Sequence, residues 1–145
     1  MSTRREGREL ALQALYSADM SLLDGTKVLE RIVESFADGS EPVVGKNSKA
    51  LSFALELLNG VLANRTEVDQ WIAEKSTNWA ISRMARIDLS ILRLAVYELV
   101  FCPDIPKNVT INEAIEIAKK YGALDSSAFI NGILDEIALA LPGKV

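Results

Sequence analysis

The chain has 145 residues, of which 49% are hydrophobic and 25% charged, and its formal net charge at pH 7 is −4. This profile predicts one globular domain, residues 1–145. It contains no histidine and one cysteine, Cys102. This composition argues against histidine-based catalysis, an internal disulfide and most zinc sites. We therefore expect that the protein is not an enzyme and has no cofactor or metal site. We find neither a signal-peptide pattern nor a run of roughly 18 apolar residues, and therefore expect a cytoplasmic protein without a membrane partner.

The apolar residues recur at spacings of three and four along nearly the whole chain, which predicts an all-α fold of about seven helices. We place the first four helices at residues 4–19, 27–37, 47–64 and 67–74. The fifth covers residues 82–101 and ends before Pro103, because proline disfavours helical geometry in the residue that precedes it.

The sixth helix is expected to begin at Thr110, which forms a capping-box pattern with Glu113, and to end at Gly122. The seventh begins near Asp125 and ends before Pro142. Its apolar residues lie on one stripe that must be buried against other helices, so we expect a compact bundle, or two small bundles that share a core.

The first helix has an unusual charge distribution. Arg4, Arg5 and Arg8 occupy its opening turns, although the positive end of the helix dipole favours acidic residues there. Arg5 and Arg8 continue into Leu12, Gln13 and Tyr16 on the face opposite the expected core. This face is either a contact surface or a solvated face with an ordinary Arg5–Glu9 helix pair.

A second basic stripe is predicted on the fifth helix, where the residues follow a 3-4-3-4 spacing. These arginines either form a binding ridge, or extend along apolar surface with the charged group in solvent, or pair with nearby carboxylates. The stripe comprises Arg83, Arg86, Ser90, Arg93 and Tyr97.

The start of the seventh helix offers further binding residues. Phe129 could stack on a nucleobase or pack beneath the preceding loop, and Asp125 is either a helix N-cap or a binding residue near Lys120. Trp71 and Trp79 are expected in or beside the core. Since the net charge is negative, any binding of nucleic acid must be local.

Four stretches together resemble the NusB family and cover almost the whole chain. They are RREGRELALQALYS at residues 4–17, DLSILRLAVYEL at 88–99, DIPKNVTINEAIEIAKKYG at 104–122 and DSSAFINGILDEIA at 125–138. The resemblance implies two three-helix bundles and a protein that binds the single-stranded RNA element boxA together with NusE, a ribosomal protein of the small subunit. It further implies a place in the antitermination complex of RNA polymerase, mainly on ribosomal RNA operons.

By position, the resemblance implicates Arg4, Arg5, Arg8, Asp125 and Phe129 in RNA binding, and Tyr16 and Asp88 in NusE binding. From their positions on the predicted helices we add Gln13, Arg93 and Lys120 to the RNA-binding set and Leu12 to the partner-binding set. The family often has a third consecutive arginine where this chain has Glu6, which weakens the expected attraction for phosphate.

Two other functions are compatible with parts of this sequence. NusB-like domains also occur in RNA cytosine methyltransferases, but we do not expect that activity here, because 145 residues leave no room for a methyl-donor domain and the cysteines of such enzymes are not present. The face containing Leu12 and Tyr16 could instead pair with a second copy, which would make the protein a homodimeric helical adaptor.

Overall fold

A computed structural model describes residues 3–21, 27, 48–77 and 79–145, and this part of the chain is helical without strands. The chain divides into two compact units, residues 1–62 and 63–145. This confirms the all-α expectation. The helix predicted at 27–37 lies almost entirely outside the described residues, and no helix within them is long and apolar enough to cross a membrane.

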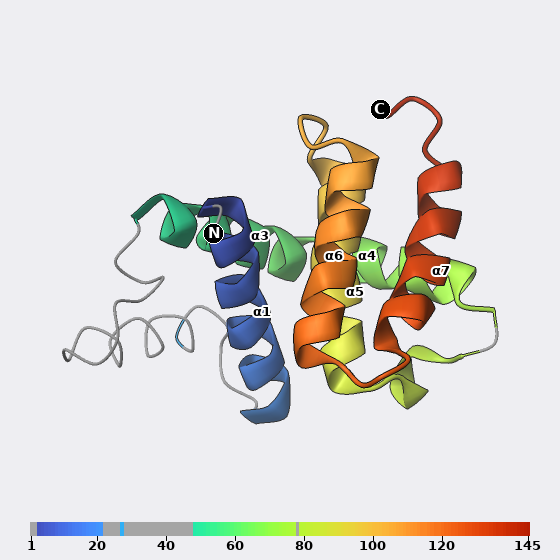
Figure 1. Cartoon of the computed structure of the whole chain (residues 1–145), viewed down its shortest axis with the longest axis horizontal. Coiled ribbons are helices and arrows are strands. Elements are labelled where there is room, and N and C mark those ends of the chain that lie inside the picture. The colour runs from blue at the N-terminus through green and yellow to red at the C-terminus, as the bar shows by residue number, and fades with distance from the viewer. Residues whose placement is uncertain (1–2, 22–26, 28–47, 78) are drawn as a thin grey trace. The chain divides into compact units, whose positions relative to one another are not determined.

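The first unit contains α1 (Thr3–Ser21) and α3 (Ser48–Ala63), which contact each other near the start of α1 (Figure 1). Gly7 makes this contact close, because a Cβ there would lie 2.9 Å from both the Ala50 carbonyl oxygen and Cδ2 of Phe53. Apolar side chains at helical spacing are buried on both helices, and they include Leu10, Ala11, Ala14 and Leu15 of α1 and Ala54, Leu57, Leu58 and Val61 of α3.

The second unit is built around α5 (Arg86–Phe101), which contacts α4 (Arg65–Lys75), α6 (Lys107–Tyr121) and α7 (Ser126–Leu139) (Figure 1). Most residues of α5 from Asp88 to Leu99 are buried, as the apolar character of its faces predicts. The apolar stripe of α7 packs into the same core through Ile130, Ile133, Leu134 and Ile137.

The predicted fifth helix begins four residues too early. Ile81–Arg83 form a short 3-10 helix, η2, and the next two residues, Met84 and Ala85, have extended backbones with ψ of 144° and 136°. The apolar pattern continues through this break because Met84 is buried, so periodicity alone could not locate it. Arg83 therefore does not share a helical stripe with Arg86 and Arg93.

The capping box predicted at Thr110 is wrong, because α6 begins one turn earlier, at Lys107 after Pro106. The hydroxyl of Thr110 donates a buried hydrogen bond of 3.0 Å to the Glu98 carboxylate of α5. This bond satisfies two buried polar groups and joins α5 to α6. Gly122 ends α6 as predicted.

Two lysines cap the carboxyl ends of helices in the second unit. Lys107 donates hydrogen bonds to the carbonyl oxygens of Ala138 and Leu141, and Lys144 donates to those of Glu98, Leu99 and Cys102. Each ammonium lies where the helix dipole favours a cation. Burial lowers the pKa of Lys144 below the usual lysine value, although nearby acidic groups, including Glu98, oppose this effect.

Candidate nucleic-acid interface

In the first unit, the arginines at the start of α1 gather around one aromatic ring of α3. The guanidinium carbons of Arg4 and Arg8 lie 5.1 Å and 5.4 Å from the ring centroid of Phe53, which is within cation–π range. Arg4 is exposed and Arg5 is half-buried, whereas Arg8 is only 4% exposed. Direct contact with a ligand is thus easiest for Arg4.

The rest of the predicted contact face of α1 is less exposed than expected. Leu12 is only 1% exposed, so its assignment to an exposed partner-binding face was wrong; the helical spacing places it beside polar residues but does not show that it is covered. Gln13 and Tyr16 are half-buried. Both remain accessible enough to contact a partner. The alternative homodimer face, however, has almost no exposed surface at Leu12.

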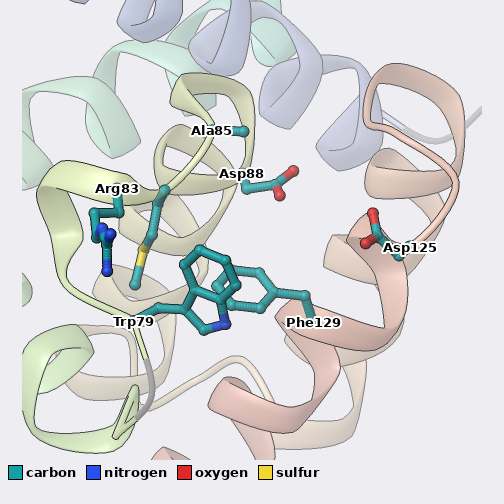
Figure 2. A pocket seen from close by; sticks show the side chains of 7 residues that line it. Trp79, Arg83, Ala85, Asp88, Asp125 and Phe129 are labelled. Atoms are coloured by element: carbon teal, nitrogen blue, oxygen red, sulfur yellow. The ribbon is translucent and has the colours of Figure 1, made fainter.

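The second unit contains an open pocket of about 250 Å³ between η2, the start of α5 and the start of α7. Figure 2 shows the side chains that surround it. The pocket brings together one residue from the predicted partner-binding set and two from the predicted RNA-binding set. Its lining residues are Trp79, Arg83, Met84, Ala85, Asp88, Asp125 and Phe129.

Asp88 is the most constrained polar group of this pocket. It is 8% exposed, and its buried Oδ1 has no hydrogen-bond partner among the described residues. Figure 2 shows the carboxylates of Asp88 and the exposed Asp125 turned toward each other. A buried acceptor without a partner is costly to leave unsatisfied, so this side of the pocket suits a ligand that brings a hydrogen-bond donor or a cation.

Two aromatic rings form another wall of the pocket. Trp79 and Phe129 meet edge to face, with ring centroids 6.4 Å apart and an interplanar angle of 86°. Trp79 is 51% exposed, so the expectation that it packs in or beside the core was wrong, while Phe129 is half-buried. Exposed aromatic surface beside the cation of Arg83 can accept a stacked planar group.

Arg93, which we assigned to RNA binding, is instead enclosed in the core of the second unit. Its Nε and Nη2 atoms donate hydrogen bonds of 2.9 Å and 3.1 Å to the two carboxylate oxygens of Asp69 on α4. The Arg93 side chain is 5% exposed. The alternative in which arginines of this stripe pair with carboxylates therefore holds for Arg93, and direct RNA contact by its guanidinium was the wrong expectation.

The remaining predicted residues lie near the turn between α6 and α7. Lys120 is exposed, with its ammonium 5.3 Å from the ring centroid of Tyr121. Asp125 occupies the N-cap position of α7 but makes no capping hydrogen bond. The neighbouring Ser126 hydroxyl accepts a hydrogen bond from the Ala123 amide in the turn before α7, and Asp125 lines the pocket.

Sequence reasoning missed Trp79 as a site residue and placed Arg83 on the wrong element. A signal was present for the tryptophan, since Trp79 follows the polar run Ser76–Asn78 between two predicted helices. A large aromatic side chain in a polar loop has few apolar residues near it in sequence that could cover it, so it tends to stay exposed.

The comparisons with known proteins agree with this architecture. The model of the NusB family matches residues 5–139. A transcription antitermination protein NusB from Geotalea uraniireducens is 72% identical over 144 residues, which are 99% of each chain. Among solved structures, NusB of T. maritima is 36% identical with a TM-score of 0.79, and the match covers 94% of this chain and 90% of that one.

A second solved structure shows the same fold at lower sequence identity. It contains the antitermination factors NusB and NusE in complex with dsRNA, is 24% identical with a TM-score of 0.81, and covers 97% of this chain and 98% of that one. The relatives with 72% and 65% identity are both transcription antitermination proteins NusB. The chain therefore belongs to the NusB family of transcription antitermination proteins.

Proposed function

We propose that this protein binds boxA-type single-stranded RNA together with NusE and thereby supports antitermination by RNA polymerase on ribosomal RNA operons. The observation that carries the proposal is the pocket of the second unit, where exposed aromatic surface, the Arg83 cation and the buried acceptor of Asp88 line one cavity. The solved structure of the same fold that contains NusB and NusE in complex with dsRNA supports NusE and RNA as partners.

The pocket has the chemistry that an unpaired ribonucleotide needs. Bases of single strands stack on aromatic side chains, and their edges carry hydrogen-bond donors and acceptors that a duplex would hide. The rings of Trp79 and Phe129 supply the stacking surface, and the exposed Arg83 can pair with phosphate.

The partner protein has a distinct role in the proposal. The chain is acidic, with a net charge of −4, so the general field around it repels RNA and its own affinity should be modest. NusE adds further RNA-binding surface, and a cationic or donor group of NusE satisfies Asp88. The two-protein complex is then the form that binds RNA tightly.

A gel-shift titration tests the proposal directly. The RNA probes are a synthetic boxA-type single strand and a scrambled strand of the same length, each titrated with this protein alone, with NusE alone and with both. We expect the boxA strand to be bound more tightly by both proteins than by either one, and more tightly than the scrambled strand. Equal binding of the two strands, or no gain from combining the proteins, would refute the proposal.

A further inference from the structure

The ring of Phe53 is the common contact of the basic residues at the start of α1. Phe53 lies on α3 and is 9% exposed, so it offers almost no surface to a ligand. It nevertheless contacts the guanidinium groups of both Arg4 and Arg8, at 5.1 Å and 5.4 Å from its centroid. The residue belongs to none of the sequence stretches that predicted RNA binding.

The backbone of α1 is shaped to permit this arrangement. Arg4, Gly7 and Arg8 are spaced three and four residues apart and so share one face of the helix. At Gly7 any side chain would meet the Phe53 ring and the carbonyl oxygen of Ala50 at 2.9 Å. The glycine therefore lets the ring of Phe53 fit against α1 beside both arginines.

Such a contact changes how an arginine binds an anion. A free arginine side chain loses much rotational freedom when it is fixed against a ligand, and part of that loss is avoided when the side chain is already ordered. The negative face of an aromatic ring also attracts guanidinium groups, which offsets the repulsion between two neighbouring cations.

We infer that Phe53 is a positioning residue for RNA binding: its ring holds the exposed Arg4 guanidinium ready to contact an RNA phosphate, with the buried charge of Arg8 beside it. Phe53 itself does not touch the RNA. The inference rests on the proposed function, because it assigns this role in the same RNA complex. It adds a residue of α3 to the RNA contacts proposed for α1.

The test compares full-length variants in complex with NusE on the boxA-type single strand. Phe53→Leu keeps an apolar side chain but removes the aromatic ring, so we expect RNA affinity to fall about fivefold, the cost of ordering one arginine side chain only when the RNA binds. The salt dependence should also weaken, by up to about 0.7 in the slope of log K against log salt if the Arg4 phosphate contact is lost. Phe53→Tyr keeps the ring and should bind RNA like the wild type.

A control separates positioning from general loss of packing. Val61→Ala removes buried side-chain volume from the same helix, at a residue with no exposed surface, and should leave RNA affinity and the salt slope unchanged. A ring-fluorinated phenylalanine at position 53 keeps the shape of the ring but weakens its negative face, and should reproduce the loss of affinity without unfolding the chain.

The free protein provides an independent readout. Ring currents of Phe53 should shift the side-chain proton resonances of Arg4 in NMR spectra, and Phe53→Leu should abolish the shift. Wild-type affinity and slope in both the Phe53→Leu and the fluorinated protein would overturn the inference while leaving the proposed function intact. Absence of boxA binding by the wild-type complex would overturn the proposed function, and this inference with it.

Discussion

At the scale of single residues, the clearest feature is a carboxylate that the fold buries without fully satisfying. Asp88 is in the first turn of α5, where the helix dipole favours an acid, yet its Oδ1 has no hydrogen-bond partner within the described part of the chain. An acceptor that the chain itself leaves unsatisfied needs a donor from outside the chain, such as water or a binding partner. This placement agrees with the assignment of Asp88 to partner binding, which stays a prediction.

We predict that Asp88→Asn weakens the binding of NusE about tenfold, the loss expected when a charge-assisted hydrogen bond becomes a neutral one. The side chain keeps its shape, so the melting temperature should change little. Isothermal titration of the variant with NusE measures the effect. The control is Asp135→Asn, which removes a carboxylate from an exposed position of α7; equal NusE affinity for both variants would remove Asp88 from the interface.

Part of the candidate pocket is predictable from the sequence, through the family resemblance for Asp88 and through both the resemblance and helix position for Asp125 and Phe129. The pocket contains Asp88, Asp125 and Phe129, all of which had been selected from the sequence. The fate of the arginines could not be predicted, because whether a guanidinium faces solvent or a carboxylate depends on the packing of helices distant in sequence. Arg93 pairs with a residue 24 positions away, and no local pattern reports that contact.

At the scale of helices, α4 and α5 are joined by a charged pair as well as by apolar packing. The Arg93–Asp69 pair is bidentate, and Arg65 of α4 lies 3.9 Å from the same carboxylate. Val68 and Ile72, which lie one residue before and three residues after Asp69 on α4, are fully buried. Because Arg93 is enclosed, its charge depends on Asp69 for compensation.

We predict that Asp69→Asn lowers the free energy of unfolding by roughly 3 kcal/mol, because it leaves a buried arginine without its counter-charge. Urea denaturation followed by circular dichroism measures this change. Glu74→Gln alters an exposed acid of the same helix and should change the stability by less than about 0.5 kcal/mol. If Asp69→Asn is equally harmless, the ion pair does not stabilise the contact between α4 and α5.

The helices themselves were largely predictable, and their ends less so. Helical periodicity located α1, α3, α4, α6 and α7 within a few residues, since each carries apolar residues at helical spacing, although α4 buries only Val68 and Ile72. It failed at Met84 and Ala85, where two extended residues interrupt the helix without interrupting the apolar pattern. It also failed at Thr110, whose hydroxyl bonds to a different helix rather than to its own backbone.

At the scale of the whole molecule, an acidic protein is proposed to bind an anionic ligand. The net charge of −4 opposes RNA binding, so affinity must come from a few cations placed where phosphates approach. In the first unit these are the arginines of α1. In the second unit they are Arg83, which lines the pocket, and Lys120 in the last turn of α6, and both are exposed. That each group contacts RNA remains a prediction.

The salt dependence of RNA affinity tests this central claim most directly. For the complex of this protein with NusE on a boxA-type single strand, we expect log K to fall with log salt at a slope of about −2 or steeper. Three phosphate contacts, each contributing about 0.7, give this value. Arg4→Gln should reduce the steepness by about 0.7, the share of one contact. A slope that is identical for the wild type and the variant would show that the exposed cation of α1 does not bind the RNA backbone.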